Sequence, residues 1–158
     1  MFKFIKKIFI LILIIIILVC SFITYEGYSM YKEVISKESI VKKVEKIKEY
    51  DNYISISEVP ETYKNATIAI EDHRFYSHGA IDVFTTARSF IENIRNKELS
   101  NGGSTITQQV ARNMYFTQEK SFIRKVAELF VAVDLEKNYS KDEILEMYLN
   151  IIYFGDGY

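Results

Sequence analysis

The sequence is poor in several residue types that would carry common chemistries. Its 158 residues include one cysteine, one proline, two histidines and no tryptophan. A single cysteine, Cys20, excludes a disulfide framework and a zinc site built from thiolates. His73 and His78 are five residues apart, which is a poor spacing for one helix face, and no third zinc ligand is evident. Neither a phosphate-binding P-loop nor the Gly-x-Ser-x-Gly turn of serine hydrolases is present.

An excess of basic charge is also missing. Without the first 24 residues, 17 basic and 21 acidic side chains leave a net charge of −4. A domain that binds nucleic acid usually carries a basic surface, so we expect no nucleic-acid partner. The length leaves room for one domain at most.

One long apolar run stands at the N-terminus, in residues 8–24. A helix of about 17 residues rises roughly 25 Å, which is close to the thickness of a membrane's hydrocarbon core. Three lysines precede it within residues 1–7, which favours a cytoplasmic N-terminus and places everything after Tyr25 outside. A cleaved signal peptide is the alternative, but the small residues of a cleavage site are missing near Leu18. We therefore expect an uncleaved single-pass anchor in a cell membrane.

The rest of the sequence divides at about residue 57. Residues 25–56 are rich in Lys and Glu and are expected to form a stalk or linker that is helical in part. Residues 57–158 form the expected domain, with breaks at 78–79 and 101–103. Its pattern is helical almost throughout, so the predicted fold class is mostly α.

Four helices are expected in this domain, each with one apolar face. Pro60 marks the first helix start, Asp82 can cap the second, and Ser140 with Glu143 forms a capping box for the last. The faces are Tyr63, Ala66, Ala69 and Ile70; Phe84, Ala87, Ile91 and Ile94; Phe122, Val126, Leu129 and Val133; Ile144, Met147, Tyr148 and Ile151.

Glu71 and Asp72 form a pair of carboxylates at the end of the first of these helices, followed by His73 and His78. A carboxylate at the edge of an apolar helix can be partly desolvated, which raises its pKa and makes it a better base. Taken alone, the segment fits an ordinary solvated helix end with surface ion pairs better than a catalytic site.

A glycine-rich segment spans residues 102–109 and reads Gly-Gly-Ser-Thr-Ile-Thr-Gln-Gln. The glycines allow backbone N–H groups to turn inward, and Ser104, Thr105 and Gln108 add donors at an expected helix start. Such a segment can hold phosphate or sugar oxygens, although a simple capped loop is the alternative.

Four cations follow within a short stretch of an otherwise acidic domain: Arg112, Lys120, Arg124 and Lys125. Arg124 and Glu128 are four residues apart and share a helix face, which also suits a simple surface ion pair. The concentration of positive charge after a glycine loop is what binding of a pyrophosphate requires.

Together these segments resemble glycosyltransferase family 51, the transglycosylase domain of penicillin-binding proteins and of monofunctional transglycosylases. The family's three ordered motifs are met over about 100 residues, which makes the resemblance specific. They correspond to Glu71, Asp72, Phe75, His78 and Gly79; to Gly102–Gln109 with Arg112 and Asn113; and to Arg124, Lys125 and Glu128. A further stretch, residues 143–155, also looks like the family.

The resemblance implies a lysozyme-like fold behind the membrane anchor. The reaction would polymerise lipid II with a lipid-linked glycan chain through β-1,4 bonds, inverting the anomeric carbon. Glu71 would be the catalytic base, and Glu128 would act on the donor side, through a divalent cation such as Mg²⁺ or Mn²⁺. Substrate-binding residues would be Asp72, His78, Ser104, Thr105, Gln108, Arg112, Lys120, Arg124 and Lys125. Cell-wall synthesis proteins would be its partners.

Two departures from the family pattern bear on activity. Arg112 stands where the family usually has lysine, which keeps the charge. The sequence stops at residue 158, inside a run that continues in the family, so we expect an incomplete domain. An inactive membrane-anchored remnant that binds lipid II or partner proteins is therefore the alternative. A lysozyme-like hydrolase is disfavoured because it would not need the basic stretch.

Overall fold

The computed structural model describes residues 2–96, 102–117 and 121–152, and over these residues the protein is helical without strands. The predicted mostly α fold is therefore confirmed for the described part. The elements are α1 (Phe2–Lys37), α2 (Ile40–Lys48), α3 (Glu61–Glu71), a short 3₁₀ helix η1 (Phe75–Ser77), α4 (Val83–Asn96), α5 (Ile106–Tyr115), α6 (Phe122–Asn138) and α7 (Lys141–Ile151).

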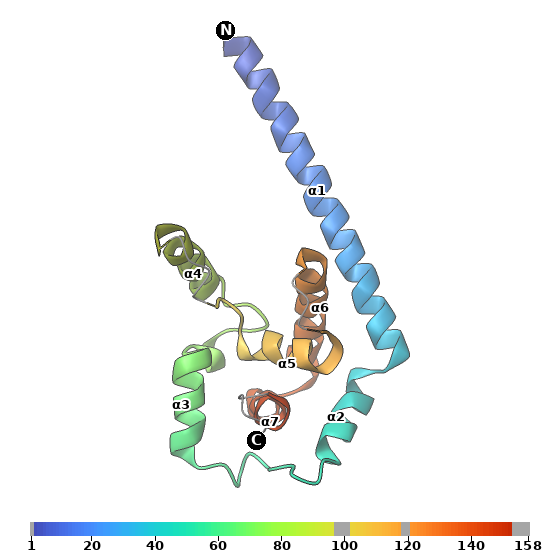
Figure 1. Cartoon of the computed structure of the whole chain (residues 1–158), viewed down its shortest axis with the longest axis vertical. Coiled ribbons are helices and arrows are strands. Elements are labelled where there is room, and N and C mark those ends of the chain that lie inside the picture. The colour runs from blue at the N-terminus through green and yellow to red at the C-terminus, as the bar shows by residue number, and fades with distance from the viewer. Residues whose placement is uncertain (1, 97–101, 118–120, 153–158) are drawn as a thin grey trace.

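The long helix α1 stands out from the rest of the molecule, as Figure 1 shows. Its N-terminal part projects alone, whereas its C-terminal part lies beside α6. Within α1, residues 3–37 are long and apolar enough to cross a membrane, and the exposed apolar side chains of its first half fit a lipid environment. The predicted anchor thus lies in a helix that continues well past residue 24.

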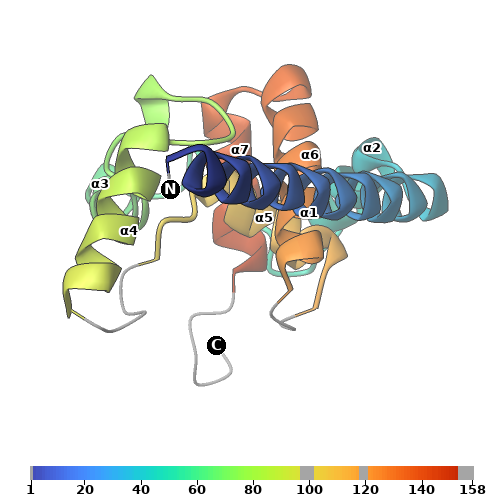
Figure 2. The same cartoon turned by 90° about the horizontal axis from the view of Figure 1, so that it is seen from above.

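The core lies where α5, α6 and α7 meet, with α2 closing one side. Seen from above in Figure 2, α3 and α4 lie on the other side of this centre from α2. The largest apolar side chains without exposed surface are Phe75, Ile106, Leu135, Ile144 and Leu145. These residues position the three elements that carry the sequence motifs.

Residues 25–56 differ from the expected stalk. Ile40, Val44 and Ile47 on α2 are buried in the core, and Tyr31 packs against it from α1. Ser39 caps α2 by accepting a hydrogen bond from the Lys42 backbone. Spacings of four and three residues put these apolar side chains on one face of α2, and this face is covered by the domain. The segment is therefore part of the folded unit.

Helices α3 and α4 do not bury the faces expected from their sequences. Ile70 is 81% exposed on α3 and Phe84 is 74% exposed on α4, whereas Thr67 and Ser89 are buried instead. The prediction that these apolar stripes face a core is therefore wrong. Periodicity identified the helices but could not tell which side of each would meet the domain.

Helix α6 buries a face that lies beside the predicted one. Phe122 is exposed, and Val126 is only partly buried, whereas Ala127, Glu128 and Val131 are inaccessible to solvent. Because α6 packs against both α1 and α5, its small residues Ala127 and Ala132 allow the close approach to the core. In α7 the predicted face and the Ser140–Glu143 capping box are both confirmed.

Candidate active site

Glu71 is the last residue of α3, and its carboxylate is exposed but held at both sides. Oε2 of Glu71 accepts a hydrogen bond from Nε2 of Gln109, 2.9 Å away on α5. Tyr148 on α7 hydrogen-bonds the same carboxylate; burial, the charge of Glu71 and this hydrogen bond raise the pKa of Tyr148, in that order. The carboxylate is therefore open to solvent for a reaction and fixed in direction by two donors.

The neighbouring Asp72 is buried, and both of its carboxylate oxygens contact other groups of the chain. Oδ1 lies 2.7 Å from Nε2 of His78, and Oδ2 accepts a hydrogen bond from the Ile106 backbone at 3.1 Å. The other ring nitrogen of His78 lies 2.6 Å from the carbonyl oxygen of Gly79. In this arrangement Asp72 and His78 tie the end of α3 to the start of α5, so the first motif orients the second.

The glycine-rich segment leads into α5 as the sequence predicts, and Thr105 is the cap. The Thr105 hydroxyl accepts from the Gln108 backbone and donates to the Ala80 carbonyl at 3.0 Å. The Gln108 side chain donates to the same carbonyl, also at 3.0 Å. Both side chains are buried and hold the loop around Ala80. A Cβ on Gly103 would lie 3.4 Å from atoms of α4, so glycine allows the segment to pass close to that helix.

Glu128 lies in the second turn of α6 and is 1% exposed, between two cations. Oε1 is 3.3 Å from Nη1 of Arg124, and Oε2 is 3.2 Å from Nζ of Lys125. Lys125 also donates to the Ser104 hydroxyl at 2.7 Å, which joins the glycine-rich segment to α6. Burial lowers the pKa of Lys125, as do the charges of Arg112 and Arg124, while Glu128 opposes the shift.

Arg112 on α5 connects these two carboxylate centres. Its charge acts on Tyr148, beside Glu71, and on Lys125, beside Glu128. Its Nε is buried and has no hydrogen-bond partner among the described residues. Since Gln109 and Arg112 are three residues apart on α5, they share one side of the helix. This side of α5 therefore faces Glu71 at one end and the cations around Glu128 at the other.

The positive charge in this cluster exceeds the negative charge. Arg124 and Lys125 pair with the one carboxylate of Glu128, and the charge of Arg112 acts on Lys125, so these four residues together carry two more positive charges than negative ones. The predicted fourth cation, Lys120, lies outside the described residues. An excess of buried or half-buried cations is costly without an anion, and a diphosphate would supply the missing charge.

A divalent cation does not fit the donor set around Glu128. Mg²⁺ prefers several oxygen ligands, but the two oxygens of Glu128 already face Arg124 and Lys125. Three neighbouring cations would also repel the ion. The predicted role of Mg²⁺ or Mn²⁺ at Glu128 therefore has no support from the surrounding side chains.

A second group of potential ligands is also already paired. Ligand atoms of Asp72, His78 and Asp82 lie within 4.8 Å of one another. However, Asp72 pairs with His78, and Oδ2 of Asp82 lies 3.4 Å from Nε of Arg74. Burial acts to raise the pKa of Asp82, but hydrogen bonds from Thr85 and the charges of Arg74 and His78 hold it below its ordinary value. This group is an ion-pair network that holds the start of α4.

Two residues that the sequence did not assign complete the arrangement. Gln109 belongs to the glycine-rich motif, and Tyr148 was placed in the apolar stripe of α7. Tyr148 is 1% exposed, and a buried phenol needs a hydrogen-bond partner. That requirement was a usable signal, but the sequence could not tell that the partner is Glu71.

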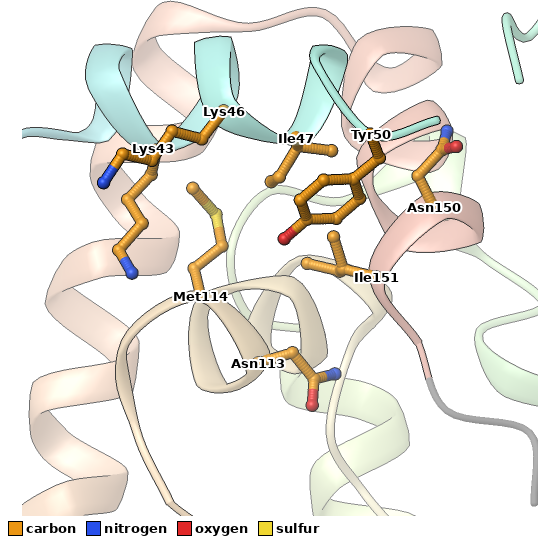
Figure 3. A pocket seen from close by; sticks show the side chains of 8 residues that line it. All are labelled: Lys43, Lys46, Ile47, Tyr50, Asn113, Met114, Asn150 and Ile151. Carbon is orange, nitrogen blue, oxygen red and sulfur yellow. The ribbon is translucent and has the colours of Figure 1, made fainter. Parts of the chain in front are cut away.

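A pocket of about 250 Å³ lies between α2, α5 and α7, away from Glu71 (Figure 3). Lys43 and Lys46 at its edge pair with Glu38, and the amide of Asn150 bonds the backbone of Ile54. Figure 3 shows Met114 reaching from α5 toward α2 beside Ile47. Lys43, Lys46 and Asn150 are thus committed within the chain, whereas the buried Nδ2 of Asn113 has no hydrogen-bond partner among the described residues.

Comparison with known proteins gives matches over most of the sequence. A family model described as Transglycosylase matches residues 37–158. A protein named monofunctional glycosyltransferase from Staphylococcus aureus (strain JH9) is 46% identical over 122 residues, which cover 77% of this chain and 45% of the relative. Penicillin-binding protein 1F of Bacillus subtilis (strain 168) is 48% identical over 104 residues, covering 66% of this chain and 15% of the relative. The chain thus spans less than half the length of these curated relatives.

Proposed function

The chain belongs to the transglycosylase family, and from this premise we propose that it carries the front part of a peptidoglycan glycosyltransferase acting at the membrane. The proposed substrates are lipid II and a glycan chain that is linked to a lipid pyrophosphate. The observation that carries the proposal is the arrangement along α5, which places an oriented exposed carboxylate and a cation cluster on one side of a helix.

Glu71 is the proposed base. An alcohol is a weak nucleophile at neutral pH, so the acceptor's 4-hydroxyl needs a group that removes its proton. Gln109 and Tyr148 support this role because they fix the direction of the Glu71 carboxylate without covering it. As the acceptor oxygen forms its bond to the anomeric carbon of the donor, its proton passes to Glu71.

Arg112, Arg124 and Lys125 are proposed to receive the leaving group. The bond between the anomeric carbon and the pyrophosphate oxygen breaks with its electron pair, so negative charge develops on the departing lipid pyrophosphate. Fixed cations near that charge stabilise the transition state more than mobile solvent would. Glu128 holds Arg124 and Lys125 in place, and no step of the proposed reaction is routed through a metal ion.

Helix α1 is proposed to span the cell membrane once, with the three N-terminal lysines in the cytoplasm and the domain outside. The apolar residues of α1 and the lysines before them support this orientation. Because both substrates are lipid-linked, an anchored enzyme meets them at a raised effective concentration.

Polymerisation of lipid II by the purified chain in detergent micelles tests the proposal. We expect Glu71→Gln to lower the rate by at least about a hundredfold, as loss of a general base commonly does, while lipid II binding is kept. Turnover of the Glu71→Gln variant close to that of the unaltered chain would reject Glu71 as the base. The matched control is Glu61→Gln, at the opposite exposed end of α3.

The same assay separates the proposal from a non-catalytic role. If the chain binds lipid II but forms no glycan even when it is extended to the length of its relatives, a lipid II-binding protein without turnover becomes the better description. If the extended protein alone polymerises, the residues beyond the chain complete the site.

A further inference from the structure

Gly27 lies in the contact between the anchor helix and the domain. This residue is buried where α1 meets α6, and a Cβ added to it would lie 2.6 Å from Cβ and Cγ1 of Val126. The carbonyl oxygen of Ile123 would be 3.0 Å away. Real Cβ atoms do not approach a neighbouring Cβ so closely, so any side chain at position 27 would push the two helices apart.

Aromatic side chains continue this contact for two turns. The ring of Phe130 on α6 lies 5.2 Å from the ring of Tyr28 and 5.6 Å from that of Tyr31 on α1. One turn further, the hydroxyl of Tyr31 donates a hydrogen bond to the carboxylate of Asp134. Gly27, Tyr28 and Tyr31 of α1 thus contact Val126, Phe130 and Asp134 of α6 in the same order. The two helices therefore run parallel and in a fixed register, as Figure 1 also shows.

This register sets the level of the cation cluster relative to the membrane. The apolar run of α1 ends at Ile23, and Gly27 follows four residues later, which is about 6 Å of helix rise. The headgroup layer on one side of a bilayer is roughly 5–8 Å thick. Arg124 and Lys125 lie between Ile123 and Val126, the two residues nearest Gly27, so they lie at that level.

The exposed aromatic residues agree with this depth. Tyr25 is 70% exposed on α1, and Phe122 is 82% exposed at the start of α6, close to the end of the apolar run. Aromatic side chains are enriched where a membrane meets water, because they tolerate both environments. Phe122 next to two cations therefore fits the boundary between hydrocarbon and headgroups.

We propose that the contact of Gly27 with Val126 fixes the depth of the catalytic domain, holding Arg124 and Lys125 in the headgroup layer at the level of lipid phosphates. Gly27 is thus a positioning residue that acts through α6. The inference that a lipid diphosphate is the ligand rests on the proposed function. The inferred depth of the domain does not. At this depth the diphosphate of a lipid meets the cations without the lipid being lifted from the bilayer.

The depth can be measured with a nitroxide on Phe122→Cys in a Cys20→Ser background, in vesicles of phosphatidylethanolamine and phosphatidylglycerol. Relaxation by oxygen, which enters the bilayer, is compared with relaxation by a water-soluble nickel chelate. We expect the label at the headgroup level, whereas a label on Tyr50→Cys, an exposed residue after α2, should lie in water.

Insertion of Lys-Ala-Glu-Ala between Thr24 and Tyr25 moves the intact contact outward. The label at position 122 should then shift by about 6 Å toward water. Affinity for a polyprenyl diphosphate held in the vesicles should fall at least tenfold, while affinity for inorganic pyrophosphate is unchanged. Failure to bind either diphosphate in the unaltered chain would count against the proposed function and leave the depth measurement intact.

Gly27→Leu tests the contact itself and should release α6 from α1, giving a faster-moving label without a defined depth. Because Gly27→Leu can also fail to fold, a second variant combines Gly27→Ala with Val126→Gly. The smaller residue at position 126 returns the space that the new Cβ takes, so the contact between the helices should be kept. An unaltered chain with its label in bulk water, or a label that keeps its depth after the insertion, would overturn the inference.

Discussion

The Asp72 carboxylate accepts a hydrogen bond from the backbone N–H of Ile106 at 3.1 Å, which links the end of α3 to the first turn of α5. The two residues are 34 positions apart in the sequence. Through this bond the segment that carries Glu71 and the segment that begins with the glycines are held as one unit. The base and the helix that faces it are therefore positioned by a buried side chain that need not touch substrate.

Replacing Asp72 with alanine should destabilise the domain. The change leaves the Ile106 N–H and the His78 ring buried without their partner, and an unsatisfied buried donor costs about 1–3 kcal/mol. The midpoint of chemical unfolding, followed by circular dichroism in detergent, should fall accordingly. Asp51→Ala, at an exposed position, is the control and should leave the midpoint unchanged.

Replacing Tyr148 with phenylalanine should slow polymerisation without unfolding the chain. The ring that packs in the core is kept, and only the hydroxyl that contacts Glu71 is lost. Hydrogen bonds to charged groups contribute about 1.5–3 kcal/mol, so we expect a loss of roughly ten- to a hundredfold in kcat. Tyr63→Phe, an exposed residue of α3, should keep the full rate. A Tyr148→Phe enzyme with normal kcat would show that Glu71 is oriented without the phenol.

Binding of inorganic pyrophosphate should weaken as the pH rises. This weakening should begin at a pH below the ordinary titration range of lysine. Burial and the neighbouring Arg112 and Arg124 lower the pKa of Lys125 from 10.5, so its charge is lost earlier than in a free lysine. Affinity therefore falls as the pH rises through the lowered pKa of Lys125. Titration calorimetry across this range, compared with Lys125→Arg, checks the prediction. Arginine stays protonated, so the variant should lack the fall that Lys125 causes, while deprotonation of pyrophosphate itself affects both proteins alike. Parallel curves would contradict the assignment.

Divalent cations should not act through Glu128. Its two oxygens face Arg124 and Lys125, so removal of the carboxylate frees these cations rather than opening a metal site. We expect Glu128→Gln to lower polymerisation, while the ratio of rates with and without added Mg²⁺ stays equal to that of the unaltered chain. A ratio that collapses to one only in the variant would instead support a metal at Glu128.

The sequence alone predicted the motifs and the helices well, but it predicted poorly which side of each helix is buried. The capping box of Ser140 and the Asp82 cap depend on side chains close in sequence, so local rules located them. Whether Ile70 and Phe84 are covered depends on what packs above them, and periodicity does not contain that information. The same limit explains why α2 was read as a stalk although Val44 and Ile47 are core residues.

The site shows the same division. Glu71 and Glu128 were identified by motif, and Glu128 pairs with Arg124 and Lys125 on its own helix. Other contacts come from distant elements: Gln109 lies 38 positions from Glu71, and Ser104 lies 21 positions from Lys125. Contacts of such separation are set by packing of α3, α5, α6 and α7. The roles of Asp72, His78, Thr105 and Gln108 in binding substrate stay predictions, while their observed contacts are with the chain itself.

Because α1 runs from the apolar segment into the domain as one uninterrupted helix, the anchor and the domain share a single axis. A membrane helix responds to a thinner or thicker bilayer by changing its tilt. If α1 spans the membrane as proposed, such a tilt would also move α6 and the domain attached to it. Lipid chain length would then rotate one face of the domain toward or away from the membrane surface.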